Sequence, residues 1–276
     1  MTAEVWMGYL LDHEPDFTVI QSPFVLNGTR VFGADSDATT LAVAAILHRQ
    51  QHETVMAVSV PEGIDAETVA VACGLATSGE DGMGVVDWDL LLSDEATLVF
   101  ARSGADVAIS PMDVEVEVDP DFHAAMEAAW GAELASSHVS QGAYVSMAQY
   151  GEAAAPRLNL QGQQSVSGLV WPPRFTDQAM GQASTHHALR RRGVVLSWTT
   201  LSAAGAPSEF SLRAPVLDGV STVLLELEDG PNGVFLTVDD EESDLDFGCS
   251  MELVLRRIYA QEGFIRYGLK ARAIQF

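Results

Sequence analysis

The chain has 276 residues, and its 39 acidic side chains against 14 basic ones give a formal net charge of −25. This charge disfavours nucleic acid and anionic membranes as partners, because both are bound through Lys and Arg that neutralise phosphate. Apolar residues make up 47% of the sequence, enough to bury a core, which excludes a wholly disordered chain. Thirteen of the bases are Arg and one is Lys, which favours a halophilic protein, whose acidic surface salt screens, over an ordinary acidic one.

The charge is unevenly divided along the chain. Residues 1–150 hold 24 acids and 3 bases, a net charge of −21, whereas residues 151–276 hold 15 acids and 11 bases, a net charge of −4. The crossover falls in a small, polar stretch near Gly151–Gln164, which is typical of a linker. We therefore predict an acidic domain over residues 1–150 and a second domain after the linker.

Cysteine content and hydropathy indicate a cytoplasmic protein. Cys73 and Cys249 are too few for a disulfide framework or a four-cysteine zinc site. No apolar run approaches the ~20 residues that span a bilayer. The sequence has no Lys or Arg before Arg30 and so lacks the charged start of a signal peptide.

Helical and strand-like patterns alternate in the first half. Asp35–Gln51 carries apolar residues at helical spacing behind a Ser36 or Asp37 cap. Further elements follow in chain order: a strand over Val55–Val60, a helix over Asp65–Ala76, strands over Val85–Leu92 and Thr97–Ala101, and a helix over Asp121–Leu134. Strand, helix and strand in this order predict an α/β layer.

The second half is rich in strand-like runs separated by turn signals. There are five such runs: Gly193–Leu201, Val220–Glu228, Gly233–Asp239, Met251–Tyr259 and Phe264–Ile274. Five short strands of this size suit a small closed barrel such as the OB-fold, although sandwiches share the pattern. The predicted fold class is therefore α+β, with an N-terminal α/β domain and a C-terminal five-stranded OB-fold β-barrel.

Residues 155–276 also resemble a known family. The motifs occur in a specific order: Gly168–Arg174 (GLVWPPR), Gly193–Thr199 (GVVLSWT), Ala214–Pro215, Leu225–Gly230 (LELEDG) and Phe247–Gly248. Together they resemble the acyl-CoA-associated OB-fold subunits that accompany thiolases and hydroxymethylglutaryl-CoA synthases. The resemblance implies a linker helix and a zinc ribbon over residues 151–192, followed by the barrel over residues 193–276.

The chain departs from this family at the zinc ligands. The family's four cysteines fall at about Gln164, Ser167, Asp177 and Met180, and none of these is a cysteine. Thiolates are what a structural zinc of this type needs, and Gln, Ser and Met do not replace them. We therefore expect a degenerate ribbon without metal, held by packing around Trp171, Pro172 and Pro173.

The first half carries a weaker resemblance to the thiolase superfamily, over about fifty residues around Arg30–Ala45 and Val55–Val60. A synthase of that superfamily needs a Cys nucleophile at a helix N-terminus, where the dipole favours the thiolate. Cys73 lies inside the apolar run Val69–Leu75, which has the pattern of a helix interior. This half is therefore interpreted as a thiolase-like remnant without a catalytic site.

Two charged segments remain. Arg190, Arg191 and Arg192 form the densest positive patch in the sequence, suited to docking an acidic surface, to the phosphates of coenzyme A, or to a solvated turn without a specific partner. Asp239–Asp246 packs six acids into eight residues but lacks the Gly and terminal Glu of a calcium loop. We interpret it as a solvated acidic hairpin.

These observations predict a non-catalytic accessory protein. It would bind a thiolase or hydroxymethylglutaryl-CoA synthase and help to hold or channel an acyl-CoA thioester, with Trp171, Pro172, Pro173, Arg174 and Arg190–Arg192 as docking or CoA-binding residues. Two alternatives stay open: an acyl-CoA pathway enzyme that uses Cys73 or a histidine, and an OB-fold nucleic-acid binder, which the net charge disfavours.

Overall fold

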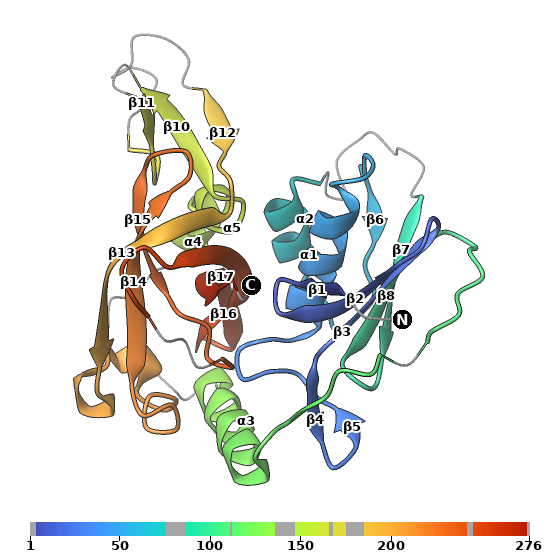
Figure 1. Cartoon of the computed structure of the whole chain (residues 1–276), viewed down its shortest axis with the longest axis horizontal. Helices are drawn as coiled ribbons and strands as arrows, with labels where there is room; N and C mark the ends of the chain where they lie inside the picture. Colours follow the sequence, from blue (N-terminus) through green and yellow to red (C-terminus); the bar gives the residue numbers. More distant parts are fainter. Residues whose placement is uncertain are drawn as a thin grey trace. The chain divides into compact units, whose positions relative to one another are not determined.

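The computed structural model describes residues 4–75, 87–110, 112–135, 147–165, 168–174, 185–241 and 245–274 (Figure 1). The fold is mixed α+β, with few helices and many strands in several sheets, which confirms the predicted class. Two compact units make up the chain: Met1–Glu127 with Leu255–Arg257, and Ala128–Val254 with Ile258–Phe276. The predicted domain boundaries near residues 150 and 192 stay predictions. None of the described helices is long and apolar enough to cross a membrane.

A six-stranded sheet forms the first unit. Its order is β1 (Glu4–Trp6), β2 (Tyr9–His13), β3 (Phe17–Gln21), β8 (Thr97–Arg102), β7 (Trp88–Ser93) and β6 (Val58–Ser59). Neighbouring strands are antiparallel except β6 and β7, which are parallel. A smaller sheet joins β4 (Phe24–Leu26), β5 (Thr29–Arg30) and β9 (Val116–Glu117). The strands before residue 31 were not predicted, and the strand predicted over Val55–Val60 is reduced to two residues.

Two helices of this unit begin after an aspartate cap, and the sequence predicted the cap of the first. Helix α1 (Ala38–Arg49) begins after Asp37, whose side chain accepts a hydrogen bond from the Thr40 N–H in a capping box. Ser36, the alternative cap, instead has its hydroxyl at the Gly33 N–H. Helix α2 (Ala66–Cys73) begins after Asp65 and ends at Gly74, which has a left-handed conformation. The predicted helices are therefore confirmed, each shorter by a few residues.

The second unit contains the five predicted C-terminal strands. They are β13 (Arg192–Leu201), β14 (Val220–Leu227), β15 (Asn232–Leu236), β16 (Ser250–Gln261) and β17 (Phe264–Ala273). They form an antiparallel sheet in the order β15-β14-β13-β16-β17. A single parallel bridge between Thr237 and Ala271 links the segment after β15 to β17, but the described strands form an open sheet, and the predicted closed OB barrel stays a prediction.

A small sheet occupies the segment where the resemblance places a ribbon. It pairs β10 (Gln161–Ser165) with β11 (Gly168–Val170) on one side and with β12 (His186–Ala188) on the other. Before it come α4 (Met147–Glu152) and α5 (Ala154–Leu158), and the predicted helix over Asp121–Leu134 is α3 (Pro120–Leu134). Two short 3-10 helices, Ala203–Gly205 and Ser208–Phe210, lie between β13 and β14.

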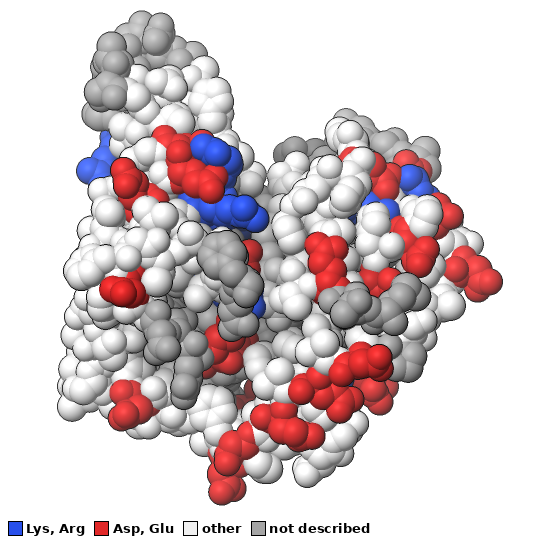
Figure 2. Space-filling view, in the orientation of Figure 1, with Lys and Arg blue, Asp and Glu red and all other residues white. Residues whose placement is uncertain are grey.

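Basic side chains of this chain are buried more often than acidic ones. Seven of the fourteen basic side chains are buried: Arg49, Arg213, Arg256, Arg257, Arg266, Lys270 and Arg272. Among the described acids only Asp35 and Glu133 are buried to the same degree. The solvent therefore meets a more acidic surface than the net charge indicates, and acidic side chains are widespread on the face in Figure 2.

Candidate functional site

The predicted Trp-Pro-Pro-Arg turn is anchored on the C-terminal sheet. The Trp171 Nε1–H donates to the Pro156 carbonyl at 3.1 Å, and the indole stacks on Phe235 with ring centroids 5.2 Å apart. A Cβ at Gly233 would lie 2.6 Å from the Phe235 ring and 2.9 Å from the Trp171 ring. Only glycine therefore leaves room for this stack, which ties the small sheet to β15.

The rest of the turn faces solvent. Pro172 and the Arg174 side chain are exposed, and Pro173 is half-buried. The Arg174 backbone N–H donates to Gln163 Oε1 at 3.1 Å. The turn thus presents one proline and one cation from a fixed backbone.

The three consecutive arginines have different surroundings. The Arg190 guanidinium bonds to Asp229 and pairs with Glu228, both at 3.0 Å. Arg191 donates to the Leu158 carbonyl at 2.8 Å, whereas Arg192 is exposed at the start of β13. The sequence predicted one continuous patch, but Arg190 is already neutralised by two acids within its own unit. Arg192 is the member best placed to meet an outside anion.

The four positions that the resemblance aligns with zinc ligands carry no cysteine. Gln164 is exposed on β10, and its Nε2 donates to the Ser165 carbonyl at 3.0 Å. Ser167, Asp177 and Met180 lie outside the described residues. An amide, a hydroxyl and a thioether do not match the thiolate set of such a ribbon, so we derive no role for zinc.

Cys73 is placed at the wrong end of its helix for a nucleophile of the thiolase type. It is the last residue of α2, and its buried Sγ lies 3.9 Å from the Val43 carbonyl. The C-terminal end of a helix carries the negative end of the dipole, which opposes a thiolate. This geometry argues against the enzymatic alternative that uses Cys73.

An aromatic pocket of about 220 Å³ opens in the second unit. Five aromatic rings and two guanidinium groups contribute to its lining: Tyr150, Trp171, Phe235, Tyr259, Tyr267, Arg157 and Arg266. The Arg266 guanidinium lies 4.8 Å from the centre of the Tyr150 ring, and that of Arg157 lies 5.9 Å from it. The Tyr150 hydroxyl donates to the Tyr267 carbonyl and accepts from the Tyr267 N–H, which fixes α4 against β17.

Of these pocket residues, only Trp171 belongs to a sequence motif with a predicted binding role. The others come from α4 and α5 and from strands β15 to β17, which lie much later in the chain. No local motif marks their meeting, because a pocket of this kind exists only once the sheet and helices have packed.

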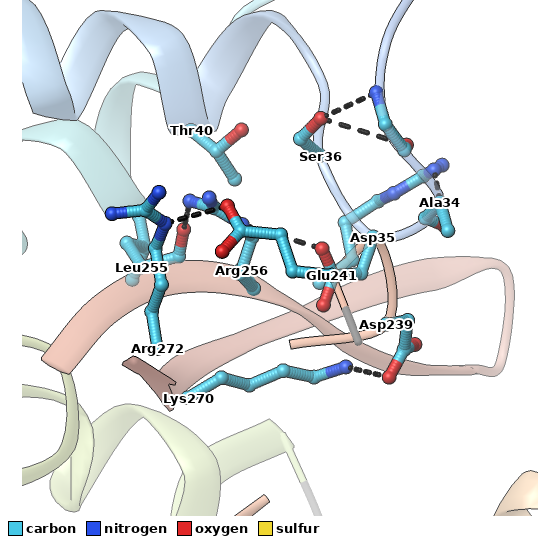
Figure 3. Close-up of polar contacts among 12 residues, drawn as sticks. Ala34, Asp35, Ser36, Thr40, Asp239, Glu241, Leu255, Arg256, Lys270 and Arg272 are labelled. Atoms are coloured by element: carbon cyan, nitrogen blue, oxygen red, sulfur yellow. Dashed lines mark hydrogen bonds and ion pairs between the residues drawn. The ribbon is translucent and has the colours of Figure 1, made fainter. Parts of the chain in front are cut away.

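The acidic run Asp239–Asp246 is in part an internal set of counter-charges, which corrects its interpretation as a solvated hairpin. Asp239 pairs with Lys270 Nζ at 2.7 Å, and Glu241 pairs with Arg272 at 2.6 Å (Figure 3). Glu252 contacts the other side of Arg272 at 2.8 Å. Burial acts to lower the pKa of Arg272, but the two carboxylates outweigh it and raise this pKa above its ordinary value.

A second buried ion pair in this unit joins Glu133 of α3 to Arg213. The Arg213 Nε donates to Glu133 Oε1 at 2.9 Å, and both side chains are almost fully buried. Arg213 lies over the Trp130 ring, 3.9 Å from its centre, and contacts Asp239 at 3.3 Å. In the first unit, the comparable pair is Asp35 with Arg256, at 3.2 Å (Figure 3).

Three histidines cluster in the first unit. The His13, His48 and His52 rings lie 4.7 to 5.1 Å apart between centroids. Burial and then the neighbouring histidines and Arg49 lower the pKa of His48 from 6.5 to about 4. No three His, Cys, Asp or Glu side chains of the described chain are arranged to hold a metal ion. The low pKa of His48 means that this imidazole is neutral at neutral pH, where it packs against the other two rings.

Strand β13 exposes an apolar row. Val194, Leu196 and Trp198 are each about one-third exposed, and Phe247 packs on Trp198 with ring centroids 5.0 Å apart. Large exposed aromatic side chains are enriched in protein interfaces.

Comparisons with known proteins give partial matches among solved structures and none elsewhere. No protein-family model matches the chain, and no curated protein matches it. Among solved structures, a chain of the Ltp2-ChsH2(DUF35) aldolase aligns at 16% identity with a TM-score of 0.33. The alignment covers 47% of this chain and 98% of that chain. A match at this identity and TM-score carries no argument about function, which is argued from the residues.

Proposed function

We propose that this protein is a non-catalytic accessory subunit of an acyl-CoA enzyme. In this proposal it binds a thiolase or a hydroxymethylglutaryl-CoA synthase and helps to hold or channel the acyl-CoA thioester. The ordered motifs of residues 155–276 support the assignment, and the five strands that the apolar pattern of this segment predicts are present.

One observation carries the proposal: the Trp171 turn is fixed by the Pro156 bond and the Phe235 stack, and yet Pro172 and Arg174 face solvent. A rigid, exposed turn loses little conformational entropy on docking. The exposed apolar row on β13 would add contact area that loses its water when a partner binds, as in the core of stable interfaces.

Arg192 is the candidate contact for the CoA phosphates. Its side chain is exposed, and among the described residues it forms no ion pair, unlike Arg190. Guanidinium groups bind phosphate through paired hydrogen bonds. In this proposal Arg192 would therefore hold the phosphates at the nucleotide end of the acyl-CoA that the partner enzyme also binds.

The test is recovery of the partner enzyme. The full chain, tagged and expressed in its native host, is captured at high salt, and the bound proteins are identified by mass spectrometry. We expect an acyl-CoA enzyme of the thiolase superfamily to be recovered, and its absence would overturn the proposal.

A charge-matched pair of variants locates the contact. Arg192→Gln and Arg102→Gln remove the same charge, but Arg102 lies in the first unit and pairs with Glu53. We expect Arg192→Gln to weaken enzyme or CoA binding about fivefold, as for a moderate ionic contact, and Arg102→Gln to leave it unchanged. Equal weakening of binding by the two substitutions would show that binding depends on the net charge and not on Arg192.

A further inference from the structure

The pocket at Trp171 is an electrostatic exception within this chain. The whole sequence has 39 acids and 14 bases, yet the described lining of the pocket holds Arg157 and Arg266 and no acid. Arg266 is almost fully buried, so solvent screens its charge weakly, and Arg157 lies exposed at the pocket on α5. An anion entering here would meet two cations and no described carboxylate in the wall.

Aromatic side chains make up much of the pocket wall. Trp171 and Phe235 stack on each other with an angle of 25° between their planes, and Tyr150, Tyr259 and Tyr267 complete the aromatic lining. Aromatic side chains accept a further ring in offset or edge-to-face geometry. The volume of about 220 Å³ is below the roughly 300–1,000 Å³ of sites for drug-sized ligands, so the pocket fits a single small ring system.

The pKa of Tyr259 shows which charges act inside the pocket. Burial raises the pKa of its hydroxyl, and the charges of Arg157 and Arg266 oppose that rise while Glu209 adds slightly to it. Both guanidinium groups therefore act on the pocket interior. Gly268 lines the same wall, where a Cβ would lie 2.9 Å from Ile258 Cγ1, so a larger residue would have to displace that side chain.

We infer that this pocket binds a small planar aromatic anion. Two sources share this chemistry: a free aromatic carboxylate and the base and phosphate of a nucleotide. The rings would stack on the ligand plane, the exposed Arg157 guanidinium would pair with its negative charge, and the charge of the buried Arg266 would add to the attraction. This inference rests on the pocket alone and does not require a partner enzyme.

Calorimetry on the full chain tests the inference with four probes. Naphthoate and adenosine monophosphate are the anions, and naphthalenemethanol and adenosine are their uncharged counterparts. We expect at least one anion to bind about tenfold more tightly than its uncharged counterpart, because a charge-assisted bond is lost in the latter. The anion that binds identifies the source of the ligand. Failure of both anions to bind, or equal affinity for a charged and an uncharged probe, would overturn the inference.

Two substitutions test whether the anion binds in this pocket. Arg157→Gln removes a charge from the pocket lining, whereas Arg102→Gln removes one from the first unit, outside that lining. We expect about fivefold weaker anion binding for Arg157→Gln and unchanged binding for Arg102→Gln. Equal effects in the two variants would contradict this location.

A fluorescence measurement gives an independent readout. The bound anion should quench Trp171, so quenching should disappear in Trp171→Phe while the circular dichroism spectrum is retained. Undiminished quenching in Trp171→Phe would show that the anion binds elsewhere. These probes contain no enzyme, so the outcome is separate from the capture experiment on the accessory role.

Discussion

Removing one charge of the buried Glu133–Arg213 pair should destabilise the protein more than removing both charges. The two side chains are 0% and 1% exposed and are 2.9 Å apart. Replacing Arg213 with Met leaves the Glu133 carboxylate buried without its cation. Replacing Glu133 with Leu leaves the guanidinium buried with the more distant Asp239, at 3.3 Å.

The magnitude follows from the cost of an uncompensated buried charge. Each single substitution should lower the free energy of unfolding by about 3–5 kcal/mol. The double variant places apolar side chains opposite each other, and Asp239 keeps its pair with Lys270 at 2.7 Å. We therefore expect the double variant to be more stable than either single variant, with a coupling energy of at least about 3 kcal/mol.

Urea unfolding of the four chains at neutral pH measures this coupling. The matched control is the exposed pair Arg190–Glu228, whose side chains are 63% and 38% exposed. A cycle on that pair should give a coupling of about 0–1 kcal/mol. Additive effects of Glu133→Leu and Arg213→Met would refute the reasoning that this interior pair acts as one unit.

Two further predictions concern packing and pH. Gly233→Ala should lower the free energy of unfolding by about 1–3 kcal/mol, because its Cβ overlaps the Phe235 ring, whereas Gly151→Ala on α4, with open space around it, should not destabilise. Thermal unfolding of both variants checks this, and equal stability would contradict the crowding. His48 has a folded-state pKa of about 4, below its unfolded value of 6.5, so the neutral ring stabilises the fold above pH 6.5 and that contribution is lost as the pH falls toward 4. Relative to His48→Gln, the wild type should lose up to about 1.4 kcal/mol per pH unit in this window, and parallel pH profiles of the two chains in denaturant titrations would refute the shift.

The C-terminal strands were predictable because each carries a periodic apolar pattern between clear turns. The Glu262–Gly263 turn between β16 and β17 has positive φ at both residues, as a two-residue hairpin requires. The N-terminal strands were missed because they have only two to five residues. Their signal was in the turns: Asn27–Gly28, with φ of 52° and 81°, connects β4 and β5 in the same way.

The candidate site was predictable only where one motif carries it. Trp171 stood out as part of a local sequence pattern, and the structure gives it a hydrogen bond and a stacking partner. The arginine run looked uniform because a sequence does not show partners: Asp229 is 39 positions from Arg190, and Leu158 is 33 positions from Arg191. The pocket depends on packing among α4, α5 and β15–β17, which no short pattern encodes.

The chain's one lysine has a chemical consequence. Lys270 is 1% exposed on β17 and is held by Asp239, so its amine is shielded from reagents in solution. An amine-selective acylating reagent should therefore modify this side chain only when the C-terminal sheet opens. The labelling rate at this single position then reports the population of the opened state, without an introduced probe.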